Sequence, residues 1–272
     1  MCPLISLYSN GFSMSINSWP SYSKIEIEAC SRILSSGKVN YWTGSEGKKF
    51  ESEFEKWCGV EHALSLANGS LALSSAYLSI NLGQGDELIT TPRTFIATAS
   101  SAVLLGAKPV FADVDLDSGA ITVETIEPLI TPKTKAISVV HLAGYPAYMP
   151  SIIDLAKSKN ILVVEDCAQA HGAQILENGS WRSVGSFGDV AAWSFCQDKI
   201  ISTGGEGGMI TTHRSDLWDS IWSFRDHGKS RKAVYEKKHP EGFRWLHESF
   251  GSNFRMTEMQ SALGRIQLKN IE

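Results

Sequence analysis

One short stretch decides the fold class: Ile161-Leu162-Val163-Val164, followed at once by Glu165-Asp166. A run of four apolar residues, three of them β-branched, is typical of a strand buried on both faces of a parallel sheet. A side chain at the carboxyl end of such a strand can reach a ligand bound in the crevice of the sheet. Asp166 is therefore a candidate ligand-binding carboxylate. The N-cap of a helical segment over 167–173 is an equal alternative.

Strand-like and helix-like segments alternate outward from this stretch, from about Glu61 to Thr212. We expect strands over 63–66, 87–90, 109–112, 136–141, 161–164, 190–195 and 209–212, with helices over 71–80, 96–105 and 151–159. Such an alternation is the signature of βαβ units, so the pattern predicts an α/β fold with a mostly parallel sheet. Further helices are expected over 21–34, stopped by Gly37, and over 49–57 and 256–269. The last of these patterns still runs at the end of the chain, which predicts a truncated sequence.

The composition excludes several classes of protein. The chain has 272 residues, and 25 basic against 29 acidic residues give a net charge of −4, which provides no broad cationic face for a nucleic acid. No stretch approaches the roughly 18 apolar residues of a membrane span, and the first ten residues do not read as a secretory signal. The cysteines never form a CxxC pair, which argues against a zinc ribbon and predicts a cytoplasmic location; they are Cys2, Cys30, Cys58, Cys167 and Cys196.

Lys199 follows the strand expected over 190–195 and precedes two apolar residues, Ile200 and Ile201. An amine held against an apolar surface loses solvation and becomes a nucleophile that can form a Schiff base with a carbonyl group. The alternative is a solvated lysine in a loop.

Two further features have both a functional and a plain interpretation. Asn68-Gly69-Ser70 precedes a helix and could bind an anion, since free N–H groups and the helix dipole point there; Ser70 could also be a simple N-cap. Phe95 could stack on a planar ring or fill the core. A metal site of Asp166, Cys167 and His171 lacks ligands at a recognised spacing, so we expect no metal.

Together these features fit pyridoxal phosphate, which needs a phosphate cradle, a stacking aromatic ring, a carboxylate for its ring nitrogen and a lysine. Here the chain resembles the DegT/DnrJ/EryC1/StrS family of sugar aminotransferases, of fold type I. The resemblance extends from about Trp42 to the last residue, and is carried by Asn68-Gly69-Ser70-Leu71-Ala72-Leu73, Gly85-Asp86-Glu87, Thr94-Phe95-Ile96-Ala97-Thr98, Pro109-Val110-Phe111-Ala112-Asp113-Val114-Asp115, Glu165-Asp166-Cys167-Ala168-Gln169-Ala170-His171-Gly172, Ser194-Phe195 through Lys199, Thr203-Gly204-Gly205-Glu206-Gly207-Gly208 and Asn253-Phe254-Arg255-Met256.

The resemblance implies a role for each matching site residue. Lys199 would hold the cofactor covalently and later move a proton between substrate and cofactor. Asp166 would pair with the ring nitrogen, Phe95 would stack on the ring, and Gln169 would lie near the 3′ oxygen. The phosphate would be bound by Gly69, Ser70 and Ser194, and by Asn253 of the partner subunit, which implies a homodimer with a shared active site.

The implied reaction is transfer of an amino group from an amino acid, often glutamate, to the keto group of a nucleotide-linked sugar. The product would be an amino sugar for a polysaccharide, a glycoprotein or an antibiotic. Related sugar dehydratases replace the lysine with histidine, so Lys199 favours transamination. A dehydratase and a non-catalytic binding or regulatory protein remain the alternatives.

The resemblance also implies an aspartate-aminotransferase-like, three-layer α/β/α large domain. We expect an N-terminal segment over 1–40, the cofactor-binding large domain over 41–250, and over 251–272 the start of a C-terminal portion, with the small domain largely absent. The stretch 229–248, rich in charged and aromatic residues, is expected to be a loop near the substrate.

Overall fold

A computed structural model describes residues 19–242 and 244–271, so the interpretation of the first ten residues lies outside the described part. Within these residues, seven strands form a central sheet in the order β1-β9-β8-β5-β4-β2-β3. Their bounds are β1 His62–Leu66, β2 Glu87–Thr90, β3 Lys108–Phe111, β4 Thr134–Val140, β5 Leu162–Asp166, β8 Val190–Ser194 and β9 Gly208–Thr212. Neighbouring strands from β3 to β8 are parallel, and only β9 runs against its neighbours β8 and β1. The predicted mostly parallel sheet is confirmed.

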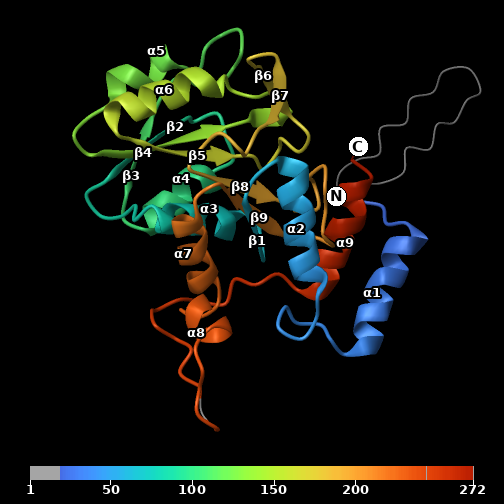
Figure 1. Cartoon of the computed structure of the whole chain (residues 1–272). Coiled ribbons are helices and arrows are strands. Elements are labelled where there is room, and N and C mark those ends of the chain that lie inside the picture. Colours follow the sequence, from blue (N-terminus) through green and yellow to red (C-terminus); the bar gives the residue numbers. More distant parts are fainter. Residues whose placement is uncertain (1–18, 243, 272) are drawn as a thin grey trace, which may run out of the picture.

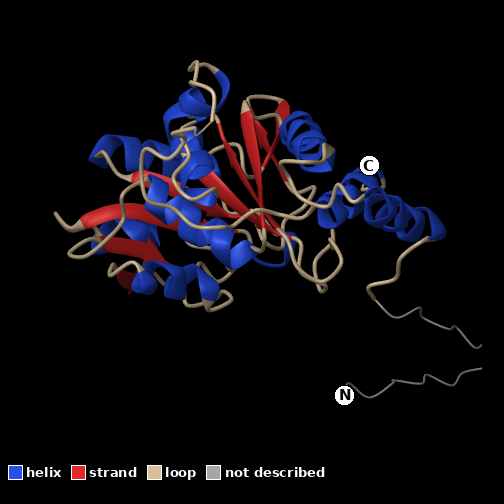
Figure 2. Ribbon diagram, turned by 90° about the horizontal axis from the view of Figure 1, so that it is seen from below, coloured by secondary structure: helices blue, strands red, loops and turns tan. Residues whose placement is uncertain are grey.

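Helices cover both faces of this sheet, as Figures 1 and 2 show. One hydrophobic core joins the sheet to α2 (Glu46–Cys58) and α6 (Met149–Lys159). A second core on the other face joins it to α3 (Gly69–Ser79), α4 (Ala97–Leu104) and α7 (Ser215–Arg225). Successive residues of β5 alternate between the two, with Val163 in the first core and Val164 in the second. The architecture is therefore the predicted three-layer α/β/α arrangement.

The bounds of the helices are α1 Lys24–Ser36, α2 Glu46–Cys58, α3 Gly69–Ser79, α4 Ala97–Leu104, α5 Val123–Ile126, α6 Met149–Lys159, α7 Ser215–Arg225, α8 Arg231–Tyr235 and α9 Glu258–Lys269, with short 3-10 turns over Glu127–Leu129 and Leu142–Gly144. The helices expected from the sequence begin and end close to the predicted positions, whereas α5, α7 and α8 were not among the predicted ranges. Gly37 ends α1 in the left-handed conformation, as predicted. In the described part of the chain, no helix is both long enough and apolar enough to pass through a bilayer.

Two of the plain alternatives for the site segments are wrong. The N-cap of α3 is Asn68 and not Ser70, because the Asn68 side chain accepts the N–H of Leu71 at 2.9 Å. No helix forms over 167–173, where the chain makes turns, so Asp166 is not an N-cap. Its Oδ1 atom accepts instead from the N–H of Ala168, two residues on.

A small hairpin, β6 Gln174–Glu177 with β7 Ser180–Ser183, was not predicted from the sequence. Asn178 and Gly179 form its turn, both with positive φ, as a two-residue type I′ turn requires. The hairpin leads directly into β8.

A buried ion pair connects α7 to α2. The Arg225 guanidinium is fully buried and donates to Glu51 Oε1 at 2.8 Å and to the carbonyl oxygen of Ser65 at 3.0 Å. It also lies over the ring of Tyr41, whose hydroxyl donates to Glu51 Oε2. These contacts fix the segment before α2 against the sheet.

The end of the described chain packs against its beginning. Glu258, at the start of α9, accepts the backbone N–H groups of Glu46 and Gly47 in the first turn of α2, where Ser45 makes no side-chain cap. A carboxylate at a helix N-terminus satisfies free donors and complements the helix dipole. α9 therefore caps a helix more than 200 residues earlier in the chain.

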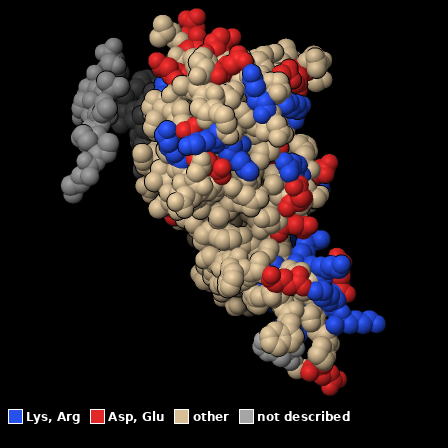
Figure 3. All heavy atoms as spheres, turned by 90° about the vertical axis from the view of Figure 1, so that its left-hand side faces the viewer, with Lys and Arg blue, Asp and Glu red and all other residues tan. Residues whose placement is uncertain are grey.

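On the face drawn in Figure 3, basic and acidic side chains lie intermixed, as the net charge of −4 leads one to expect. The described residues of the stretch 229–248, which are 229–242 and 244–248, include α8 and project away from the sheet in Figure 1. The expected position of this stretch near a substrate stays a prediction.

Candidate active site

A cavity of about 490 Å³ lies at the carboxyl ends of the parallel strands, where an open α/β sheet binds its ligands. Its size is typical of small-molecule pockets. Its walls include seven residues predicted from the sequence: Gly69, Ser70, Phe95, Asp166, Gln169, Ser194 and Lys199. Asn253, the eighth, does not line this cavity and forms an isolated bridge with Asp226.

Asp166 ends β5 on the floor of the cavity with 5% of its surface exposed. Its Oδ2 accepts from the Thr98 hydroxyl at 2.7 Å and its Oδ1 from the Ala168 N–H at 3.1 Å. Burial raises the pKa of the Asp166 carboxyl above its ordinary value, and these two hydrogen bonds act in the opposite direction. Thr98 was not predicted from the sequence as a partner of this carboxylate.

Lys199 reaches the same cavity from the loop after β8. Its side chain is 14% exposed, and its Nζ donates to Asp198 Oδ2 at 3.1 Å. Of the two apolar neighbours, Ile201 is buried and Ile200 is half exposed. The Asp198 carboxylate that accepts from this amine was not expected from the sequence.

The N-terminus of α3 forms another wall of the cavity. Asn68 caps the N–H of Leu71, which leaves the N–H groups of Gly69 and Ser70 at the first two helical positions without an intrahelical acceptor. A Cβ atom at position 69 would lie 2.6 Å from the Cβ of Ser194, so only glycine allows this approach. Free donors and the helix dipole make this corner suited to an anion.

Phe95 and Gln169 lie at other parts of the wall. The Phe95 side chain is 69% exposed, so the alternative in which it fills the core is wrong. Gln169 Oε1 accepts the N–H of Ala143 at 2.8 Å, in a turn where Ala143 has a φ of 54°. Because the amide oxygen is used in this way, the NH₂ group is what Gln169 can offer to a ligand.

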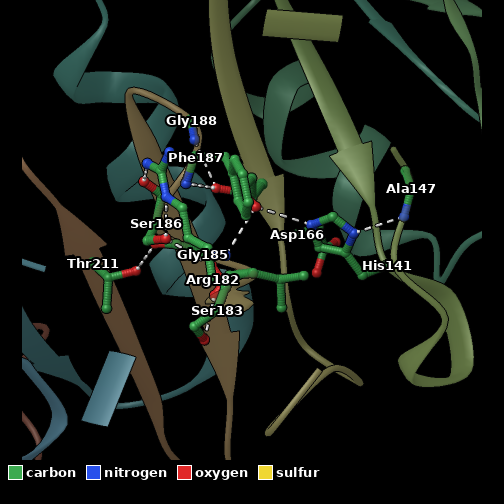
Figure 4. Close-up of polar contacts among 12 residues, drawn as sticks. His141, Ala147, Asp166, Arg182, Ser183, Gly185, Ser186, Phe187, Gly188 and Thr211 are labelled. Atoms are coloured by element: carbon green, nitrogen blue, oxygen red, sulfur yellow. Dashed lines mark hydrogen bonds and ion pairs between the residues drawn. The ribbon is translucent and has the colours of Figure 1, made fainter. Parts of the chain in front are cut away.

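Three potential metal ligands, His141, Glu165 and Cys167, have ligand atoms within 4.8 Å of one another. They are not the trio considered from the sequence, since His171 instead packs against Trp193 and Phe195. His141 Nδ1 accepts from the N–H of Ala147 (Figure 4), so its Nε2 carries the proton that it donates to Glu165 at 3.0 Å.

Glu165 also accepts the backbone N–H groups of Gly185, Phe187 and Gly188. Its two oxygens thus receive four hydrogen bonds, including the one from His141. These hydrogen bonds connect His141, directly after β4, and Glu165 of β5 to the loop that precedes β8.

Three comparisons relate the chain to known proteins. Residues 20–272 match the model of the DegT/DnrJ/EryC1/StrS aminotransferase family. The chain is 38% identical over 234 residues to a GDP-perosamine synthase of Escherichia coli O157:H7. The aligned residues cover 85% of this chain and 60% of that protein. It is 41% identical over 233 residues to a UDP-N-acetyl-3-dehydro-alpha-D-glucosamine 3-aminotransferase of Acidithiobacillus ferrooxidans, covering 86% of this chain and 59% of that protein.

Two solved structures have a fold similar to that of this chain. An aminotransferase from Psychrobacter cryohalolentis superposes with a TM-score of 0.91 at 55% identity, over 94% of this chain and 64% of that one. A GDP-4-keto-6-deoxymannose-3-dehydratase superposes with a TM-score of 0.82 at 26% identity, over 93% of this chain and 67% of that one. The chain spans about three fifths of the length of the curated relatives described above.

Proposed function

Because the chain belongs to the DegT/DnrJ/EryC1/StrS aminotransferase family, we propose that its cavity binds pyridoxal 5′-phosphate and serves a sugar aminotransferase. One observation carries the proposal. The Lys199 amine and the Asp166 carboxylate, 33 positions apart, line one cavity whose wall includes the N-terminus of α3. This cofactor needs an amine, a carboxylate and an anion-binding site around one cavity.

Each part of the cofactor has a matching feature in the cavity. The N–H groups of Gly69 and Ser70 suit a phosphate, and the missing Cβ at position 69 leaves the approach open beside Ser194. The buried Asp166 carboxylate suits a protonated ring nitrogen, and the exposed ring of Phe95 suits a planar face. The free NH₂ of Gln169 suits the ring oxygen as a donor.

The chain's own residues would act as follows. When bound, the cofactor supplies an electron-accepting ring that carries the amino group from donor to acceptor. Lys199 Nζ would hold the cofactor, and as a free amine it would be the base that moves a proton at the reacting carbon of the substrate. Asp198, which accepts from the Lys199 amine at 3.1 Å, would hold that amine in the cavity wall. Asp166 would keep a proton on the ring nitrogen.

The proposed acceptor is a nucleotide-linked keto-sugar and the proposed donor is glutamate. The relatives described above are named for GDP-linked and UDP-linked sugars, which supports a nucleotide-sugar acceptor and a role in amino-sugar biosynthesis for a polysaccharide, a glycoprotein or an antibiotic. We further propose a homodimer in which Asn253 of the partner subunit completes the phosphate site. The position of Asn253 outside its own cavity supports this.

The domain division over 1–40, 41–250 and 251–272 is also a proposal. A cytoplasmic location is our prediction from the scattered cysteines, four of which are free thiols in the described part of the chain.

The test uses the full-length protein, glutamate and a panel of nucleotide keto-sugars, with release of 2-oxoglutarate and the cofactor absorption band as readouts. We expect 2-oxoglutarate with at least one sugar, and loss of both the band and the turnover in Lys199→Ala. A protein that binds the cofactor and consumes a keto-sugar without releasing 2-oxoglutarate is a dehydratase. A protein that binds no cofactor refutes the proposal.

A further inference from the structure

The hydroxyls of Thr94 and Thr98 form a chain of two hydrogen bonds that ends at the Asp166 carboxylate. Thr98 Oγ1 lies 2.7 Å from Asp166 Oδ2, and Thr94 Oγ1 lies 2.8 Å from Thr98 Oγ1. A hydroxyl has one proton to donate, and an ionised carboxylate is the strongest acceptor that Thr98 contacts. The carbonyl oxygen of Phe95 is farther away, at 3.2 Å. Thr98 therefore donates to Asp166, and Thr94 donates to Thr98.

The backbone of Thr98 is itself held in place. Thr98 is fully buried in the first turn of α4, and its carbonyl oxygen accepts from the Tyr77 hydroxyl of α3 at 2.9 Å. The Tyr77 hydroxyl also lies 3.0 Å from Ser138 Oγ on β4. Elements on both sides of Thr98 thus fix the hydroxyl that faces the carboxylate.

The titratable groups and the burial around Asp166 oppose or favour the charge of its carboxyl, and the Thr98 hydroxyl is one of these influences. The titratable groups that face the carboxylate are His141 at the end of β4, Lys199 on the loop after β8, Tyr77 on α3 and the adjacent Cys167. Burial is the largest influence and raises the pKa of the Asp166 carboxyl. The hydrogen bond from Thr98 is the next largest, and it lowers that pKa.

We propose that Thr98, supported by Thr94, is a positioning residue that acts through Asp166. Its hydroxyl fixes the carboxylate at Oδ2 and favours the charged form, so that a cationic ring nitrogen finds an oriented acceptor. The inference rests on the proposed function, because that nitrogen belongs to pyridoxal 5′-phosphate. Thr98 itself makes no step of the reaction.

The test compares Thr98→Val, which removes the hydroxyl at nearly constant shape, with Thr98→Ser, which keeps it. Thr212→Val is the matched control, because Thr212 is equally buried and donates to the carbonyl oxygen of Asp189, outside the cavity lining. The first readout is the infrared carboxyl band of the cofactor-free protein against pH, assigned with Asp166→Asn. The second is the dissociation constant of pyridoxal 5′-phosphate.

A hydrogen bond to a charged group is strong enough to move both readouts. In Thr98→Val we expect the protonation midpoint of Asp166 to rise by about one pH unit and the cofactor to bind about tenfold more weakly. Thr98→Ser should restore both values, and Thr212→Val should leave both unchanged.

Three results would overturn the inference while leaving the proposed function intact: an unchanged midpoint and affinity in Thr98→Val, no rescue by Thr98→Ser, or an equal loss in Thr212→Val. A wild-type protein that binds no cofactor refutes the proposed function instead, and the infrared titration still tests the contact between Thr98 and Asp166. If Thr98→Val does not fold, Thr94→Val removes the outer link alone. A smaller shift in the same direction supports the inference, and no shift overturns it.

Discussion

Replacement of His171 by phenylalanine should change how stability depends on pH. The His171 side chain is buried against Trp193 and Phe195, with ring centroids 5.4 and 5.7 Å away. Neither ring nitrogen has a hydrogen-bond partner among the residues that the structure describes. Burial, and then the charge of Lys199, lower the pKa of His171 from 6.5 to about 3. The folded protein therefore keeps this ring neutral.

The direction of the effect follows from which state binds the proton. In the unfolded chain His171 takes up a proton near pH 6.5, whereas in the folded chain it does so only near pH 3. Stability is therefore fully present above pH 6.5 and is lost as the pH falls toward 3. Each pH unit in this window costs about 1.4 kcal/mol, so the loss between pH 8 and pH 5 is about 2 kcal/mol. His171→Phe removes this loss.

The assay is urea unfolding, followed by tryptophan fluorescence at pH 8 and at pH 5. Between these pH values, the free energy of unfolding of His171→Phe should fall by about 2 kcal/mol less than that of the wild type. Phe195→Leu is the control, because it disturbs the same cluster without removing a titratable group, and its curve should run parallel to the wild type. A parallel curve for His171→Phe would refute the reasoning.

Four further substitutions test three other parts of the structure. Gly69→Ala places a Cβ 2.6 Å from that of Ser194, so we expect the cofactor to bind at least tenfold more weakly in equilibrium dialysis. An unchanged affinity would contradict the proposed phosphate site at the N-terminus of α3. Glu51→Ala leaves the buried Arg225 charge unpaired and should cost about 3–5 kcal/mol in urea unfolding. Arg225→Met should cost less, because Glu51 keeps its other hydrogen-bond donors, and the reverse order would count against this account. Glu258→Ala removes the cap of α2 and should cost about 1–2 kcal/mol in a thermal melt, whereas no loss would show that solvent satisfies those donors equally well.

The sheet and its helices could be predicted because their signals are local. Buried β-branched runs such as 161–164 and helix stops such as Gly37 act within a few residues. The hairpin of β6 and β7 was missed although Asn178-Gly179 is a strong turn signal. Its strands have four residues each and expose much of their surface, so they show no apolar alternation to recognise.

The site residues were predicted by their order in a family pattern, and seven of them line one cavity. Their neighbours could not be found in this way. The contact of Thr98 with Asp166 spans 68 positions, and a buried threonine has no sequence signal that separates a donor from a packing residue. The pairing of Lys199 with Asp198 joins adjacent residues, yet loop geometry decides whether two neighbouring side chains meet.

The cap that Glu258 places on α2 has a consequence for biosynthesis on the ribosome. α2 emerges early, but the carboxylate that completes its first turn is translated more than 200 codons later. The edge strand β1 likewise waits for β9, its antiparallel neighbour in the sheet. The first turn of α2 and the edge strand β1 therefore gain their native contacts only after the late segments have been synthesised, and contacts between such distant residues slow folding.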